Sequence, residues 1–483
     1  MNFLSVEFLA FIIVFVLIYY AISPKYRYLV LLAGSYIFYG WVDYKILLVL
    51  ILTTILTYVG GNVISNGYRK KSYMFFFLLN LIILIVFKYT NFVIDNINIV
   101  GNKMGYERIP GLKLLLPVGL SFYIFQSCTY LGDVYRKKID VEKNFLRYAA
   151  FVAYFPTILS GPIQKARELL PQLENAKKFE FESAFKGLIL FIWGAFQKVC
   201  VANNLLYIIN LIYDDYESYG TPYYLVAAIS FSIYIYADFA SYSDMARGVS
   251  KILGIEIGRN FQNPYLATSL SEFWRKWHVS LNDWFVENIY IPLGGSKKGK
   301  IRKYCNILLV FLISGLWHGS EWHFVAWGVL NGILAVMGQV LASSKRKIYV
   351  LCGVDENVFS IRFAKRAGVF AWITLTWVFF YNGIGKSLYV IKEMLFFWPS
   401  ELFVPELINI CGSPVKTFVI LLMVIVFVVV QISRKKEKIY YEKFREQPVV
   451  FQCMLLAVIM YVCFMTGFST MAQLDTEFLY FQF

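Results

Sequence analysis

The sequence predicts an all-α polytopic membrane protein, and three observations support that fold class. Hydrophobic residues make up 59% of the 483 residues and charged residues only 16%, whereas soluble domains are about half apolar and about a quarter charged. The apolar residues form blocks of about 20 residues, which is the length that an α-helix needs to cross a bilayer. Lys and Arg gather in short segments between these blocks, as they do in the cytoplasmic loops of membrane proteins.

The first apolar block, Phe3–Tyr20, is predicted to be a retained transmembrane helix. It is too long and too aromatic for the core of a signal peptide, and no cleavage pattern of small residues follows it. The whole sequence predicts about a dozen membrane-embedded helices. Their approximate positions are 3–22, 28–42, 46–64, 73–95, 112–132, 146–160, 183–213, 222–240, 304–317, 322–342, 368–384, 415–432 and 449–468.

Several of these blocks are short or are interrupted by Gly and Pro. Non-helical backbone at membrane depth persists only where it is buried in protein or lines a wet cavity. We therefore expect re-entrant pieces around residues 112–132, 155–163 and 262–295. No soluble domain, repeat or low-complexity linker is expected, and residues 1–483 are predicted to form a single integral membrane domain.

The basic segments set the expected orientation, because Lys and Arg are enriched on the cytoplasmic side. Counting spans from these segments puts the N-terminus and the C-terminus outside the cell. The chain between the second and third segments is long enough for two passes, so His318 and His323 fall at the turn of a hairpin that points outward. The four segments are Tyr68–Ser72, Ser296–Lys303, Ser344–Lys347 and Ser433–Lys438.

The net charge of +15 is attributed to these loops, so we expect membrane lipids and no nucleic acid among the partners. The seven cysteines are scattered, without a Cys-x-x-Cys pair or a His/Cys spacing typical of a metal site. Most lie in or beside apolar blocks, where cysteine behaves as a small hydrophobe. We expect no metal and no disulfide framework.

All three histidines of the chain, His278, His318 and His323, lie in one central window. If Leu270–Phe285 is one helix, His278 shares a face with four apolar residues. That face fits either an interfacial helix with tryptophans at headgroup level or the wall of a cavity, and the pattern leaves both open. The four apolar residues are Trp274, Trp277, Leu281 and Trp284.

The segment Ile313–Phe324 gives a sharper signal, because Gly315 and Gly319 flank Trp317 and His318. Small residues allow the backbone to break or to approach another group closely. A neutral imidazole in an apolar setting can accept a proton near neutral pH, although a helix-capping role is the structural alternative. No Gly-x-Ser-x-Gly elbow accompanies the histidines, which favours direct transfer to a hydroxyl with histidine as the base.

Asp238, His323 and Tyr480 each allow a functional and a structural role. Asp238 and Asp244 are six residues apart and do not share a helical face, so a paired-carboxylate device is not expected; Asp238 either orients an imidazole or satisfies a broken helix. His323, five residues after His318, points to another side of a helix and is interpreted as structural. Tyr480, in the terminal "FLYFQF", is either part of an interfacial aromatic anchor or an acceptor hydroxyl.

These stretches together resemble the membrane-bound O-acyltransferase family, and most closely its bacterial branch of alginate O-acetyltransferase-like proteins. The resemblance spans roughly residues 28–483, with a core at 28–468 and a tail at 469–483. The chain departs from the family pattern at Ala237, Ala240 and His323. The matching segments are Pro117–Arg136, Tyr154–Ile163, Tyr236–Ile255, Asn260–Phe285, Tyr290–Gly295, Gly315–Gly332 and Phe478–Phe483.

The resemblance implies a ring of tilted helices, with re-entrant segments, around a central catalytic tunnel. It implies that His318 is the principal catalytic residue and that His278 is the companion histidine. It also makes Tyr480 a candidate for a brief acyl carrier. We further expect Asp238, Trp317 and Trp274 to contact the substrate.

The function implied is an O-acyltransferase that moves an acetyl group across the membrane to modify a surface or cell-wall polysaccharide. The donor expected is acetyl-CoA or an acyl carrier on the cytoplasmic side, with no cofactor bound, and the partner is an extracellular acyltransferase. One alternative is D-alanyl transfer from a carrier protein to teichoic acid. A non-enzyme alternative is a transporter or flippase.

Overall fold

The computed structural model describes most of the chain and divides it into two compact units. The first unit comprises Met1–Phe191 and Ser243–Arg259, and the second comprises Ile192–Tyr242 and the described part of Asn260–Leu479. This division does not test the expectation that residues 1–483 form a single membrane domain, which stays a prediction. The residues outside the description are 42, 68, 113, 115, 397–404, 435–436, 472–477 and 480–483, and for 405–406, 437–438 and 467–471 only the backbone is described.

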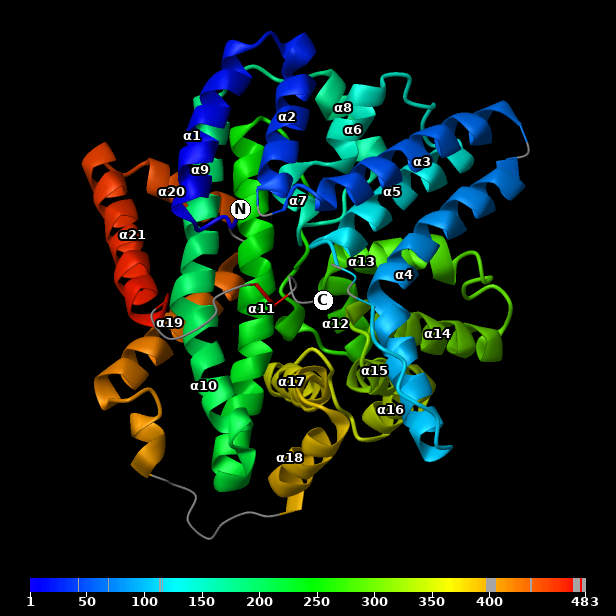
Figure 1. Ribbon diagram of the computed structural model, residues 1–483. Helices are drawn as coiled ribbons and strands as arrows, with labels where there is room; N and C mark the ends of the chain where they lie inside the picture. The colour runs from blue at the N-terminus through cyan, green and yellow to red at the C-terminus, as the bar shows by residue number, and fades with distance from the viewer. Residues whose placement is uncertain are drawn as a thin grey trace. The chain divides into compact units, whose positions relative to one another are not determined.

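The first unit is built from helices that pack in sequence-adjacent groups (Figure 1). Helices α3, α4 and α5 pack against one another, and α2 packs on α1, α6 and α7. The bounds are α1 Val6–Ala21, η1 Pro24–Tyr26, α2 Arg27–Gly40, α3 Ile46–Asn66, α4 Arg69–Lys103, α5 Leu120–Tyr135, α6 Phe145–Val152, α7 Phe155–Ile158, α8 Ala166–Glu174 and the start of α9 Phe181–Phe196.

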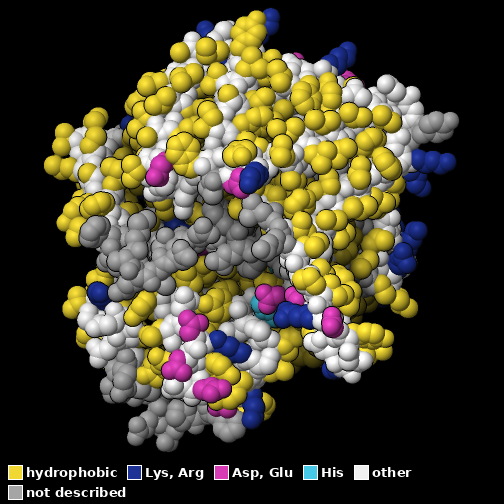
Figure 2. Space-filling model, in the orientation of Figure 1, with side chains coloured by type: hydrophobic (Ala, Val, Ile, Leu, Met, Phe, Trp, Pro, Cys, Tyr) yellow, Lys and Arg dark blue, Asp and Glu magenta, His cyan; other side chains and the backbone are white. Residues whose placement is uncertain are grey.

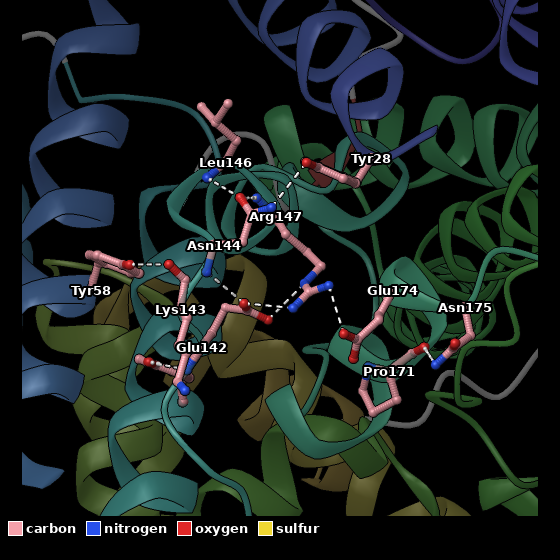
Figure 3. Close-up of polar contacts among 11 residues, drawn as sticks. Tyr28, Tyr58, Glu142, Lys143, Asn144, Leu146, Arg147, Pro171, Glu174 and Asn175 are labelled. Atoms are coloured by element: carbon pink, nitrogen blue, oxygen red, sulfur yellow. Dashed lines mark hydrogen bonds and ion pairs between the residues drawn. The ribbon is translucent and has the colours of Figure 1, made fainter. Parts of the chain in front are cut away.

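Helix α6 begins in a polar cluster that joins several helices of the first unit (Figure 3). The side chain of Asn144 caps α6 by accepting the N–H groups of Leu146 and Arg147, an N-cap of the kind that stabilises helix starts. The Arg147 guanidinium donates two hydrogen bonds of 2.8 Å to Glu142 and one of 2.9 Å to Glu174 in α8. Amide and hydroxyl contacts add α2 and α3 to the cluster. Arg147 is paired with both Glu142 and Glu174 within the unit, so the cluster has a structural role.

The second unit contains a π-helical turn, a series of short helices and several long ones (Figure 1). Helix α15 packs on α12, α14 and α17, and η2 packs on α10, α19 and α21. The bounds are η2 Gln197–Ala202, α10 Asn203–Asp214, η3 Tyr216–Ser218, α11 Thr221–Ile252, η4 Pro264–Leu266, α12 Leu270–Lys276, α13 Val279–Phe285, η5 Val286–Tyr290, α14 Lys300–His318, α15 Trp322–Val340, α16 Ala342–Leu351, α17 Phe359–Tyr381, α18 Ile384–Phe396, η6 Pro405–Asn409, α19 Pro414–Ser433, α20 Glu437–Arg445 and α21 Val449–Met471.

Most predicted apolar blocks correspond to helices, and the described residues contain no strand. Seven helices there are long and apolar enough to cross a membrane, fewer than the dozen embedded helices expected from composition. The block at 112–132 began too early, because α5 starts only at Leu120. The block at 222–240 was placed too short, because α11 runs from Thr221 to Ile252. Helices α8, α16, α18 and α20 were not expected, since each is short or mixes charged with apolar residues.

Broken backbone occurs where re-entrant pieces were expected. Helix α7 has only four residues and contains Pro156, and the region 262–295 consists of short helical pieces from η4 to η5. Helix α5 is buried along nearly its whole length. At its start, Gly119 has φ +77°, and a Cβ there would lie 2.3 Å from the carbonyl oxygen of Ile158. Only glycine fits this approach of α5 to α7.

Apolar side chains cover much of the face that Figure 2 shows, including the surface over α3 and α4. In water such a surface would be an association hazard, whereas lipid solvates it. The exposed apolar side chains on these two helices include Leu48, Leu52, Ile55, Val59, Phe75, Leu78, Ile82, Ile85 and Val86.

Helices α14 and α15 form the predicted hairpin and approach each other very closely. A Cβ on Gly315 would lie 2.4 Å from the Phe324 carbonyl oxygen and 3.1 Å from the Cα of Gly328. A Cβ on Gly319 would lie 2.0 Å from the ring of Phe324. Small residues at such interfaces let helix backbones pack without intervening side chains. The two glycines that flank Trp317 and His318 are therefore packing positions, and close approach is one of the two uses of small residues considered from the sequence.

Replacing Gly315 with Ala should destabilise the hairpin, because the new methyl group meets backbone that cannot move aside. The expected loss is about 1–3 kcal/mol, typical of overpacking, seen as a lower unfolding temperature of the purified protein in detergent. Gly338→Ala is the matched control, because Gly338 lies on the exposed side of α15 with nothing within 4 Å of a new Cβ. Equal melting temperatures for the two variants would contradict the close-contact account.

Candidate active site

His318 is the last residue of α14, and His323 is the second residue of α15. Only Gly319–Glu321 separate the two helices, so both histidines lie at the turn of the hairpin. The side of the membrane on which this turn lies stays a prediction. His318 is 4% exposed and His323 8% exposed, which is uncommon for histidine at a helix turn.

The imidazole of His318 is enclosed by aromatic rings from three helices. The ring centroid lies 4.8 Å from that of Trp317, 5.0 Å from that of Trp327 in α15 and 5.0 Å from that of Phe380 in α17. All three rings meet the imidazole edge to face. The arrangement fixes the ring plane and keeps bulk water from its flanks, as a base in an apolar site requires.

Residues 270–285 do not form the single helix that the apolar periodicity suggested. The helix breaks at Trp277 and His278: α12 ends at Lys276, and α13 starts at Val279. Two backbone hydrogen bonds hold the break open, from the Gln262 N–H to the Lys276 carbonyl at 3.0 Å and from the Val279 N–H to the Asn260 carbonyl at 2.8 Å. Tertiary hydrogen bonds to the preceding segment thus replace the helical ones.

His278 occupies the left-handed backbone region at the N-cap of α13, with φ 44° and ψ 56°. Non-glycine residues in this region are uncommon and cost roughly 1–3 kcal/mol, although His, Asn and Asp tolerate it better than most. Strain of this kind persists only where the surrounding structure enforces it. The break turns the His278 ring inward, and the residue is 2% exposed.

Trp317 connects the two histidines. Its ring centroid lies 5.9 Å from that of His278 and 4.8 Å from that of His318. The other flank of His278 meets Phe239 of α11 at 4.5 Å. The structure therefore brings His278, at the start of α13, next to Trp317 and His318 at the end of α14.

Burial lowers the pKa of the His278 imidazole from 6.5 to about 3. The residue lies outside the helices that qualify as membrane spans. Because the charged form is disfavoured without water, His278 is neutral at physiological pH. A neutral imidazole offers one N–H donor and one acceptor nitrogen, which suits it to orienting a reacting group.

Trp274 belongs to a tryptophan layer next to this cluster rather than to its centre. Its ring lies 5.6 Å from Trp327 and 6.1 Å from Trp377, and Trp327 and Trp377 stack at 5.6 Å. Trp274 therefore contacts His318 through other rings, among them Trp327. Its expected contact with substrate stays a prediction, and its described role is to support the ring beneath His318.

His323 makes contacts different from those of His318. Its Nδ1 lies 3.0 Å from the backbone carbonyl oxygen of Asn382, and its Nε2 lies 3.7 Å from Glu321. Asn382 is the C-cap of α17. His323 thus ties the hairpin turn to the end of another helix, which agrees with its structural interpretation.

Asp238 lies within α11 and its carboxylate is engaged inside the protein. One oxygen accepts a hydrogen bond of 2.7 Å from Lys198, and the other accepts the backbone N–H of Leu479 at 3.0 Å. These partners differ from the imidazole that sequence reasoning considered, and substrate contact by Asp238 stays a prediction. Tyr480, the proposed acyl carrier, lies outside the described residues.

Sequence reasoning missed several residues of the cluster. Trp327, Phe380 and Phe239 come from separate helices, and aromatic residues are so frequent in this chain that none stood out. Lys198 did carry a signal, since it is an ionisable residue inside an apolar block and such residues are functional candidates by default. Its distance from Asp238 in the chain concealed the pairing.

The lowered pKa of His278 predicts a pH-dependent stability. The unfolded ring takes up a proton near pH 6.5 and the folded ring only near 3. The free energy of unfolding is therefore highest above pH 6.5, and it decreases as the pH falls below that value. The unfolding temperature should fall between pH 6.5 and 4.5, and it should fall less in His278→Asn. Asn tolerates the left-handed backbone, and the other two histidines are present in both proteins. Parallel temperature curves would refute the assignment.

The chain is similar to a known protein family and to several of its members. The model of the membrane-bound O-acyltransferase family matches residues 135–349, the range that includes all three histidines. A probable alginate O-acetylase of Pseudomonas syringae pv. tomato is 33% identical over 80% of this chain and 72% of its own length. A peptidoglycan O-acetyltransferase of Helicobacter pylori is 31% identical over 81% of this chain and 78% of its own length.

A more distant relative is a teichoic acid D-alanyltransferase of Bacillus subtilis, which is 27% identical over 47% of this chain and 59% of its own length. The acetylating relatives therefore match the chain more completely than this D-alanylating one. With seven candidate spans in the described residues, the similarity identifies a multi-pass membrane protein. The chain belongs to the membrane-bound O-acyltransferase family and is an O-acyltransferase.

Proposed function

We propose that the protein takes an acetyl group from a cytoplasmic thioester donor, acetyl-CoA, and passes it across the membrane for O-acetylation of an extracellular or cell-wall polysaccharide. The observation that carries the proposal is His318, a buried imidazole held edge to face by three aromatic rings at the turn of α14 and α15. The names of the two acetylating relatives support acetyl as the acyl group.

His318 acts as the general base in this proposal. It takes the proton of the acceptor hydroxyl while the hydroxyl oxygen attacks the thioester carbonyl carbon. The carbon–sulfur bond of the resulting tetrahedral species then breaks, the ester forms, and the thiolate leaves with the proton from His318. General-base assistance of this kind contributes about 10²–10⁴ in rate.

His278 acts as a positioning residue or as a stabiliser of the tetrahedral species. Its ring contacts Trp317, which also contacts His318. Because burial keeps it neutral, its N–H can donate to a developing oxyanion without a change in its own charge. Pre-oriented donors in a dry site are among the largest contributors to acyl transfer.

The donor's phosphates are expected to meet the basic segments at Lys297–Lys303 and Lys345–Lys347. Lys297, Lys300 and Lys345 are all exposed, so they can attract a polyanion from solution. An acidic acyl carrier would be attracted in the same way. This proposal assigns both segments to the cytoplasmic side and both chain termini to the outside.

Tyr480 is the proposed first acceptor, from which an extracellular acyltransferase partner moves the acetyl group to the polymer. A phenol is a better leaving group than a sugar hydroxyl, since the tyrosine pKa is only ~10. An acetyl ester on Tyr480 would therefore remain reactive enough to be passed on. The described residues next to it, Phe478 and Leu479, are both buried.

Two alternatives remain to be compared with this proposal. D-alanyl transfer from a carrier protein to teichoic acid keeps the same fold, but the D-alanylating relative covers only 47% of the chain against 80% for the alginate relative. A transporter or flippase would move an acyl-bearing molecule without transferring the group. Family membership argues for the enzyme, and the label experiment below separates acetyl transfer from both alternatives.

The donor half-reaction is tested with acetyl-CoA that carries a labelled acetyl group and with purified protein in lipid vesicles. His318→Ala should slow label transfer to protein or acceptor by about 10²–10⁴, the range for a lost general base. His323→Gln is the matched control and should retain transfer, because its side-chain amide can still donate to the Asn382 carbonyl. Label transfer that does not depend on His318 would sink the proposal.

The relay is tested by Tyr480→Phe, which removes one oxygen and keeps the ring. We expect O-acetylated polymer in cells to fall to background, and mass spectrometry of the wild-type C-terminal peptide to show an added acetyl group on Tyr480. Full retention of polymer acetylation in Tyr480→Phe would leave the motif only the role of an aromatic anchor.

A further inference from the structure

A buried ion pair lies within the second unit, apart from the histidine cluster. The Nζ of Lys198, in η2, donates to a carboxylate oxygen of Asp238, in α11, at 2.7 Å. Both side chains are only 1% exposed. Burying two charges costs several kcal/mol per ion unless further hydrogen bonds satisfy them, so the surroundings of this pair have to supply additional partners.

The C-terminal segment of the chain supplies two of those partners. The backbone N–H of Leu479 donates to the second carboxylate oxygen of Asp238 at 3.0 Å. The ammonium of Lys198 lies 4.5 Å from the centre of the Phe478 ring, within the range of a cation–π contact. Asp238 thus binds Leu479, and Lys198 contacts the preceding residue, Phe478.

Helix α11 carries both Asp238 of the ion pair and a residue that contacts the candidate active site. Asp238 and Tyr242 are four residues apart and therefore share a face, and the Tyr242 ring meets the Phe478 ring edge to face at 5.3 Å. Phe239, next to Asp238, carries the ring that contacts His278 at 4.5 Å. One turn of α11 thus contacts both the C-terminal segment and a histidine of the site.

The ion pair and the C-terminal segment depend on each other. Without the Leu479 N–H and the Phe478 ring, the pair would lose two stabilising contacts in a place that water does not reach. Without the pair, the segment would lose the charge-assisted hydrogen bond of the Leu479 N–H. The position of Phe478 and Leu479 is therefore specified by a polar interaction as well as by apolar burial.

We propose that Lys198 and Asp238 form a socket that positions the C-terminal motif for acyl transfer, so that the residue following Leu479 is delivered to the site. The socket recognises the main chain at 479 through Asp238 and an aromatic ring at 478 through Lys198. This role rests on the proposed function for Tyr480, whereas the docking of Phe478 and Leu479 does not. Lys198 and Asp238 are positioning residues and take no part in the chemistry.

Docking is tested by amide hydrogen exchange at Leu479, read by mass spectrometry with residue-level fragmentation of the C-terminal peptide. The double variant Lys198→Met with Asp238→Leu removes both charges together, so no unpaired ion is left buried. Exchange at Leu479 should become about tenfold faster or more, the size expected for loss of a hydrogen bond to a charged acceptor. Lys198→Met with Asp238→Asn keeps an acceptor oxygen and should lie between it and wild type.

Asp244→Asn is the matched control, because Asp244 is a buried carboxylate of the same helix that is paired with Arg247 at 3.2 Å. Leu479 exchange should stay at the wild-type rate in this variant. Unchanged Leu479 exchange in Lys198→Met with Asp238→Leu would overturn the socket.

Positioning is tested by acetyl-Tyr480 formation from acetyl-CoA. The same double variant should lower kcat at least tenfold with an unchanged KM for acetyl-CoA, whereas general misfolding would also disturb KM and the unfolding temperature. Leu479→Pro, which lacks the N–H, should lose the reaction, and Leu479→Ala, which keeps it, should retain it. Normal Tyr480 acetylation in both the double variant and Leu479→Pro would overturn the positioning role.

Failure of the relay itself is distinguished by Tyr480→Phe, in which Leu479 exchange should equal that of wild type. Full polymer acetylation in Tyr480→Phe refutes the acyl-tyrosine of the proposed function. Slow Leu479 exchange in that same variant supports the socket, because docking is measured without any acyl transfer.

Discussion

The close contact between α14 and α15 is the constraint on which the candidate site depends. Because Gly315 and Gly328 have no side chains, the two helix backbones are in direct van der Waals contact. That approach sets Trp327 of one helix against His318 of the other at 5.0 Å. His318 is the final residue of α14. Any increase in the distance between the two helices would therefore move its imidazole away from the Trp327 ring. The site is therefore built on a rigid helix pair rather than on a loop.

A second constraint acts on His278 through the backbone. The segment at Asn260 and Gln262 hydrogen-bonds across the break between α12 and α13, and a side-chain bond of 2.7 Å from Ser280 to Asn260 reinforces it. These contacts stabilise a left-handed histidine that an isolated peptide would avoid. The strain is local, and it turns the ring toward Trp317 instead of along the apolar face that the sequence suggested.

Sequence periodicity was sufficient for most helix positions and for the hairpin that carries His318 and His323, because long apolar blocks leave few other structures in a membrane. It failed at Trp277–His278, since the apolar spacing continues across a break that only tertiary hydrogen bonds create. It also missed Lys198, whose partner is far away in the chain. The roles expected for His318, His278 and Tyr480 came from the family resemblance, because a pattern in a single sequence does not indicate which residue performs catalysis.

The indole of Trp317, placed between the two imidazoles, affects how protons can move in the site. An indole N–H can donate a hydrogen bond, but the ring has no lone pair to accept one. It therefore cannot serve as a link in a proton wire, even though both histidines contact it. Both imidazoles contact Trp317, yet its indole offers no route for a proton between them. In the proposed mechanism, a proton taken up by His318 therefore has to return to the substrate or leave by another path.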